Sequence, residues 1–171
     1  MSKLPTAKTE KDYQFEKVSL DLVQQGFRVV DEDRSRPWGG FFVLDERQVR
    51  AFAEAYFEGI PADQLQLTAK LSPKLLLVAP QQRLSWQYHH RRAEIWQVVQ
   101  GPVGVVMGVS DTPTGPERLE TGQRVALAPE QRHRLVGLAN WGIVAELWQH
   151  TDPALPSDEY DIVRLEDDFG R

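Results

Sequence analysis

The chain has 171 residues and no cysteine, and its 20 Lys or Arg residues against 25 Asp or Glu residues give a formal net charge of −5. This length suits one domain, and the lack of cysteine excludes disulfides, thiolate metal sites and cysteine nucleophiles. The negative charge argues against a general nucleic-acid binder. No apolar run approaches the ~20 residues that cross a membrane, and the polar N-terminus lacks the apolar stretch of a signal peptide. We therefore expect a cytoplasmic protein with neither a nucleic-acid nor a membrane partner.

Two helices are predicted in the first third of the chain. Apolar residues recur at helical spacing over Asp12–Gln25, and Gly26 follows as a stop. A second helix is expected over Arg47–Glu58, with Asp45 as its cap and a glycine after its end.

Short runs rich in Val, Leu and Trp, separated by turn residues, begin after Gln66. Their steady spacing predicts an antiparallel sandwich or barrel. The expected strands are Leu75–Ala79, Leu84–His89, Glu94–Gln100, Gly104–Val109, Arg124–Ala128, His133–Gly137 and Ile143–Trp148. The last stretch, Asp158–Arg171, is interpreted as a charged C-terminal tail.

Polar side chains gather in this strand region at spacings that suit a metal site. Gln87 and His89 are two residues apart, so they share one face of a strand. A short turn would fold Glu94 back beside His89, and His133 begins a later strand. Two imidazoles and two oxygens suit zinc, cobalt, manganese, iron or nickel. The alternative is an inert histidine pair on an exposed hairpin, but a Gln and a His facing a core are costly unless bonded or ligated.

Four stretches of the chain resemble the motifs of one known family. They are Arg36-Pro37-Trp38-Gly39, Ser85-x-Gln87-x-His89-His90-x-Arg92-Ala93-Glu94-x-Trp96, Arg132-His133-Arg134-Leu135, and the C-terminal Asp161–Arg171. With these motifs the chain resembles the type II phosphomannose isomerase family of the cupin superfamily. The resemblance implies a mainly β fold, a cupin-type double-stranded β-helix (jelly-roll barrel) with two added N-terminal helices. Residues 1–35 would form a helical extension and residues 36–171 the cupin domain.

The resemblance also implies one divalent metal ion, with zinc as the first choice. Its ligands would be Gln87, His89, Glu94 and His133. The candidate catalytic residues are Arg134, Lys74 and Glu146, and the candidate substrate-binding residues are Arg92, Arg132 and His90. Glu146 is included because it is a carboxylate among apolar strand residues. It would either face the cavity and act as an acid or base, or face solvent at a strand edge. Arginine near the site suits a phosphosugar, because it binds phosphate bidentately.

The chain departs from the family pattern at several positions. Arg91 and Ile95 stand where the family usually has histidines, and Gly137 stands where it usually has asparagine. There is no Gly-rich nucleotide loop, so nucleotide transfer is not expected. The first hypothesis is a homodimeric, metal-dependent sugar-phosphate aldose–ketose isomerase that interconverts mannose-6-phosphate and fructose-6-phosphate. The alternatives are another metal-dependent cupin enzyme, acting on an unphosphorylated sugar or with oxygen, and a non-catalytic sugar-binding cupin.

Overall fold

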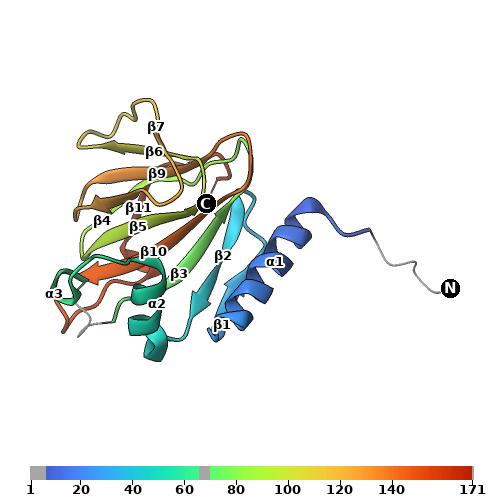
Figure 1. Cartoon of the computed structure of the whole chain (residues 1–171). Helices are drawn as coiled ribbons and strands as arrows, with labels where there is room; N and C mark the ends of the chain where they lie inside the picture. Colours follow the sequence, from blue (N-terminus) through green and yellow to red (C-terminus); the bar gives the residue numbers. More distant parts are fainter. Residues whose placement is uncertain (1–6, 66–69, 171) are drawn as a thin grey trace.

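The computed structural model describes residues 7–65 and 70–170, which form two facing antiparallel sheets (Figure 1). The first sheet contains, in spatial order, β1 (Val29–Asp33), β2 (Gly39–Leu44), β3 (Lys74–Val78), β10 (Gly142–His150), β5 (Arg92–Gln100) and β8 (Arg124–Leu127). The second contains β11 (Ile162–Glu166), β4 (Trp86–His89), β9 (Arg132–Gly137), β6 (Val103–Gly108) and β7 (Glu117–Leu119). The mainly β, jelly-roll prediction is confirmed.

Every strand expected from the turn spacing is present, with each end within two residues of its predicted position. The spacing did not predict β1, β2, β7 and β11. Strand β2 lies inside the six-stranded sheet, whereas the other three each lie at the edge of a sheet. Edge strands bury few side chains, so they carry a weak apolar pattern. The supposed C-terminal tail is therefore partly a strand, because β11 pairs with β4 through partners such as Ile162 and His89.

The helices form where the sequence predicts, with shifted ends. Helix α1 (Glu10–Gln24) begins after Thr9, whose side chain and that of Asp12 form a capping box. Asp45 caps a 3-10 turn that leads into α2 (Val49–Tyr56), and the short α3 (Ala62–Leu65) was not expected. Each described helix is too short or too polar to cross a membrane.

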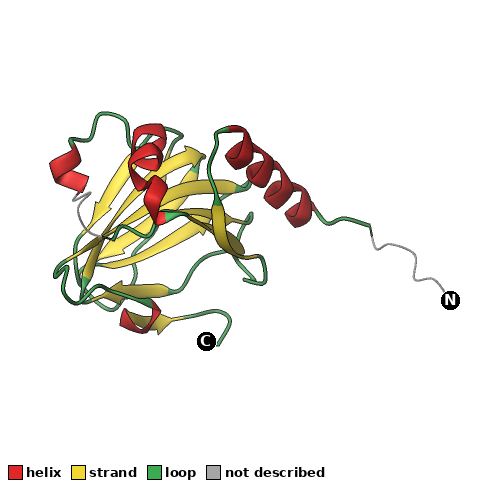
Figure 2. Ribbon diagram, turned by 90° about the horizontal axis from the view of Figure 1, so that it is seen from below, coloured by secondary structure: helices red, strands yellow, loops and turns green. Residues whose placement is uncertain are grey.

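The four central strands of the six-stranded sheet, β2, β3, β10 and β5, are largely buried on both faces. On β3, Leu75 and Leu77 pack in the cluster that contains the helices' buried residues, whereas Leu76 and Val78 pack in the cluster between the sheets. Figure 2 shows α1, α2 and α3 along one side of the sheets and the C-terminal segment, with a short 3-10 turn (Glu159–Asp161), on the other. Because both faces are covered, these strands are nearly continuous apolar runs rather than alternating ones.

The described residues of the first 35 pack against the barrel through α1 and β1. Phe15 of α1 is fully buried, and its ring lies 5.3 Å from that of Phe42. Strand β1 pairs with β2 in the main sheet, although it precedes the boundary expected at residue 35. The division into residues 1–35 and 36–171 stays a prediction, and the described part of the first segment shares a core with the second.

Candidate metal centre

Three predicted metal ligands meet between the two sheets. His89 Nε2 lies 3.1 Å from Glu94 Oε1, and His133 Nε2 lies 3.4 Å from Glu94 Oε2. One potential ligand atom from each residue lies within 4.8 Å of the others, and all three residues are buried. The short turn between β4 and β5 brings Glu94 close to His89, as the sequence predicts, although the two strands lie in different sheets and do not pair with each other.

The fourth predicted ligand, Gln87, lies beside this group. It pairs with His133 across β4 and β9, so the two residues are direct neighbours in the sheet. Its Oε1 accepts a hydrogen bond of 2.6 Å from Ser85 Oγ, and its side chain lines the adjoining cavity. Gln87 is thus placed at the rim of the group rather than within it.

The unpartnered atoms of the group fit a metal. Among the described residues, Glu94 Oε2 and His133 Nε2 are buried without a hydrogen-bond partner, which is uncommon for buried polar atoms. His133 Nδ1 lies 2.9 Å from the carbonyl oxygen of Gln131, so this nitrogen carries the proton and the Nε2 lone pair is left for a ligand. Two imidazoles, a carboxylate and a neighbouring amide oxygen form a donor set suited to zinc and similar divalent ions.

The protonation states also suit ligation. Burial lowers the pKa of His89 despite the nearby Glu94 carboxylate, so the imidazole is neutral at pH 7. Burial alone would raise the pKa of Glu94, but His89 and Arg92 lower it well below its ordinary value. A neutral imidazole and an ionised carboxylate are the forms that bind metals.

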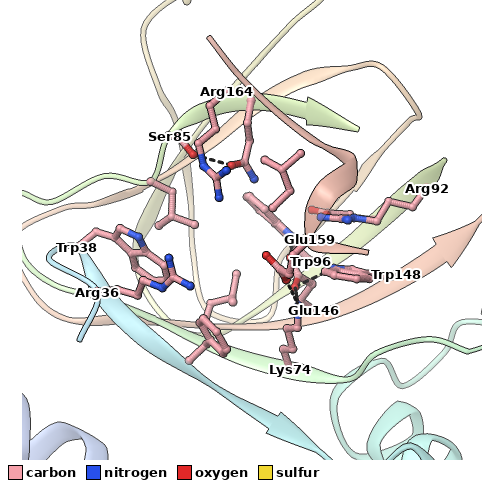
Figure 3. Close-up of a pocket in the computed structure, with 16 residues that line it drawn as sticks. Arg36, Trp38, Lys74, Ser85, Arg92, Trp96, Glu146, Trp148, Glu159 and Arg164 are labelled. Carbon is pink, nitrogen blue, oxygen red and sulfur yellow. Dashed lines mark hydrogen bonds and ion pairs between the residues drawn. The ribbon is translucent and has the colours of Figure 1, made fainter. Parts of the chain in front are cut away.

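A cavity adjoins this group and carries a second buried carboxylate (Figure 3). Glu146 Oε1 accepts a hydrogen bond of 3.0 Å from Trp96 Nε1, and Oε2 accepts one of 3.1 Å from Trp148 Nε1. Burial, together with the charge of Glu94, raises the pKa of Glu146 to about 7, against the opposing charges of Lys74 and Arg92. A group half-protonated near neutral pH suits proton transfer.

Lys74 and Arg92 bring positive charge to the same wall. Lys74 Nζ lies 4.0 Å from Glu146 Oε2 and 3.4 Å from Glu159 Oε1. The Lys74 ammonium and the Arg92 guanidinium each lie 3.6 Å from the ring centre of Trp148. Figure 3 shows Trp148 between the two cations. The indole therefore forms cation–π contacts with Lys74 and Arg92 instead of stacking on a sugar ring.

Three predicted site residues lie away from the cavity. His90 is exposed and its Nδ1 lies 2.9 Å from Glu130 Oε1, while Arg132 bonds to the Asp111 carboxylate at 2.8 Å. Arg134 follows the inward-facing His133, so its side chain points to the other face of β9, where Nη2 donates to the Glu166 carbonyl at 3.2 Å. The structure does not bring these three residues to the cavity, and their predicted roles stay predictions.

The sequence analysis predicts no role for two arginines that line the cavity. Arg36 and Arg164 line the cavity, and Figure 3 shows both side chains directed toward it. Both lie in the motifs that carry the resemblance, the first in Arg36-Pro37-Trp38-Gly39 and the second in the C-terminal stretch. Their charge within a motif is the signal that could have found them.

Comparisons with solved structures establish the fold. The chain resembles a variant of oxalate decarboxylase from Bacillus subtilis with 12% identity, a TM-score of 0.54, and coverage of 79% of this chain and 30% of that chain. It resembles the capsular polysaccharide assembling protein CapF from Staphylococcus aureus with 16% identity, a TM-score of 0.51, and coverage of 82% and 33%. KdgF from Halomonas sp. matches with 16% identity, a TM-score of 0.50, and coverage of 76% and 89%. The chain thus spans about a third of the first two proteins.

Sequence comparison is more specific. No curated protein sequence matches the chain significantly. The family model described as "Mannose-6-phosphate isomerase C-terminal" matches residues 51–167, which include all four predicted metal ligands. Because this match covers well over half of the sequence, the chain belongs to the mannose-6-phosphate isomerase C-terminal family, and its fold is that of a cupin.

Proposed function

We propose that this protein is a metal-dependent sugar-phosphate isomerase that interconverts mannose-6-phosphate and fructose-6-phosphate. The observation that carries the proposal is the meeting of a buried His89, Glu94 and His133 group with a cavity that holds Glu146 and several cations. Family membership supports the same reaction.

The metal ligands in this proposal are His89, Glu94 and His133, with Gln87 completing the set from the rim. A divalent ion held there would polarise the carbonyl and hydroxyl oxygens of the substrate. The donor set favours zinc, with cobalt, manganese, iron and nickel as the other suitable ions.

Glu146 is the proposed acid and base. Isomerisation moves one proton from C2 to C1 of the sugar and one from the C2 hydroxyl to the carbonyl oxygen, with no net oxidation. A carboxyl group whose pKa is raised to about 7 can take the carbon-bound proton and return it to the neighbouring carbon. Lys74, 4.0 Å from Glu146 Oε2, supplies positive charge where the negative charge of the enediolate develops.

The cations on the cavity wall are the proposed phosphate binders. Arg92, Arg36 and Arg164 all line the cavity, and guanidinium groups bind phosphate with two parallel hydrogen bonds. A substrate that lacks phosphate cannot form these hydrogen bonds, so we expect a strong preference for the phosphorylated sugar.

The test is turnover of mannose-6-phosphate by zinc-loaded and cobalt-loaded protein, coupled to detection of fructose-6-phosphate. We expect activity with the phosphosugar, little with mannose, and a loss of at least about 100-fold in kcat for Glu146→Gln with metal content retained. Glu159→Gln is the matched control, because Glu159 lines the same cavity but is largely exposed. Metal-loaded wild type without turnover would contradict the proposal.

A non-catalytic sugar-binding cupin is the second candidate. It is favoured by one observation, that Arg92 already bonds to Glu94 at 2.8 Å and so competes for a ligand of the metal. Saturable mannose-6-phosphate binding without turnover, at any metal loading, would support this alternative.

A further inference from the structure

Arg92 is the cavity residue most closely tied to the candidate metal ligands. Its Nε donates a hydrogen bond of 2.8 Å to Glu94 Oε1, and its Nη2 lies 3.2 Å from His89 Nε2. Its side chain is only 2% exposed, as is that of Glu94. The guanidinium therefore occupies bonding positions on two of the residues that would hold a metal.

These positions cannot be shared. An imidazole nitrogen has one lone pair, so His89 Nε2 cannot bind a metal ion while it accepts from Arg92 or, in the other tautomer, donates to Glu94 Oε1 at 3.1 Å. A divalent cation and a guanidinium held by the same carboxylate would also repel each other strongly in a buried site. In the metal-free protein, by contrast, Arg92 supplies the positive charge that the buried Glu94 needs.

The guanidinium has a second set of contacts on the side away from the ligands. Nη1 donates to Ser157 Oγ at 2.9 Å and to the Asp158 carbonyl at 3.2 Å. Ser157 is itself fixed, because its Oγ donates to Asp161 Oδ2 at 2.6 Å and its backbone N–H donates to His150 Nδ1 at 2.8 Å. Arg92 can thus leave the metal ligands and keep a partner.

We propose that Arg92 is an internal cation that closes the metal site in the metal-free protein and is released toward the cavity when a divalent metal binds. The inference rests on the proposed metal-dependent function and adds a step of regulation to its site. The released guanidinium stays beside Trp148 and Lys74, where the anionic group of a substrate would meet it. Metal binding and anion binding then favour each other, because one guanidinium serves Glu94 or the substrate.

The test follows Arg92 in the wild-type protein during titration with Zn²⁺. A buried arginine Nε–H bonded to a carboxylate gives a resolved signal in a proton–nitrogen correlation spectrum, and Arg92→Lys identifies it by its absence. We expect this signal to shift or vanish at one equivalent of Zn²⁺, while that of Arg83, bonded to Asp168 on the surface, stays. Calorimetry should show Zn²⁺ binding at least tenfold tighter to Arg92→Met than to wild type.

The outcomes separate this inference from the proposed function. Zn²⁺ binding with an unmoved Arg92 signal and equal affinity in Arg92→Met would overturn the inference and leave the metal site standing. Binding to Arg92→Met but not to wild type would support the inference in its strongest form. A failure of both proteins to bind Zn²⁺, like the His133→Ala control, would overturn the metal site and the inference together. If Arg92→Met does not fold, the wild-type spectrum alone decides.

Discussion

Polar side chains on the two faces of strands β4 and β9 lie in different environments. On the inner face, His89 and His133 are buried and His133 Nε2 has no hydrogen-bond partner among the described residues. On the outer face, their sequence neighbours His90 and Arg132 are paired with surface carboxylates. Adjacent residues of similar chemistry thus fall into an environment suited to ligand binding and one suited to solvation.

This difference follows from the pleat of the strands. Successive side chains on a strand point to opposite faces, so a motif of consecutive polar residues is divided between two environments. Family resemblance marks the whole motif and does not separate its two halves. The contrast between faces therefore predicts which substitutions affect the metal centre and which do not.

The largest expected effect is on the inner face of β9. His133→Ala removes a ligand whose lone pair faces Glu94, and loss of even an outer partner of a metal ligand costs about 10–100-fold in affinity. We expect Zn²⁺ affinity to fall at least about 100-fold, measured by calorimetry and elemental analysis. Arg132→Ala, one residue away on the outer face, is the control and should keep wild-type affinity. Equal losses in both variants would contradict the division between faces.

The second prediction concerns the pH dependence of stability at Glu146. In the unfolded chain this carboxyl ionises near pH 4.5, but in the folded protein it keeps its proton up to a pH of about 7. The folded state therefore binds more protons between these values, and its stability falls as pH rises through this window. Glu146→Gln cannot ionise, so the free energy of unfolding of wild type should fall relative to that of the variant by up to about 3 kcal/mol. Urea unfolding at pH 4.5 and pH 8 measures this, and parallel pH curves would contradict it.

The sequence predicts the buried residues of the site better than it predicts the arginines around it. Gln87 and His89 are predicted because a polar pair that faces a core is costly unless it is bonded or ligated, and Glu94 and His133 because their spacing and the family motif add them to this pair. Glu146 is predicted because it is a carboxylate among apolar strand residues. No such conflict marks Arg36 or Arg164, since a charged residue near a turn or at an edge strand is ordinary. Arg132 and Arg134 are assigned to the site by their place in a motif. The motif does not show that, on a strand, their side chains point to the opposite face from His133.

The third prediction tests Arg134, which the sequence assigns to catalysis. Its side chain bonds to Glu166 behind β9 and does not line the cavity. From this placement we expect Arg134→Met to keep wild-type Zn²⁺ affinity and to lower kcat for mannose-6-phosphate less than about tenfold, whereas a group that transfers protons contributes about 100-fold or more. A loss of 100-fold or more, with metal content retained, would restore the catalytic assignment.

The smallest expected effect is the coupling of an exposed arginine–carboxylate pair, which we compare with a buried pair. Arg83 bonds to Asp168 at 2.7 and 2.8 Å on the surface, with side chains 46% and 41% exposed. Exposed pairs of this kind contribute about 0.2–1 kcal/mol, so a double-mutant cycle with Arg83→Ala and Asp168→Ala should give a coupling free energy in that range that falls with added salt.

Arg92 and Glu94 are as close but buried, and removing Arg92 leaves an uncompensated charge that costs about 3–5 kcal/mol. Zn²⁺ should recover most of that loss at the buried pair, because the metal replaces the missing cation, and should leave the surface pair unchanged. A coupling free energy for Arg92 and Glu94 in a corresponding cycle that equals that of Arg83 and Asp168 would mean that burial does not distinguish the two pairs.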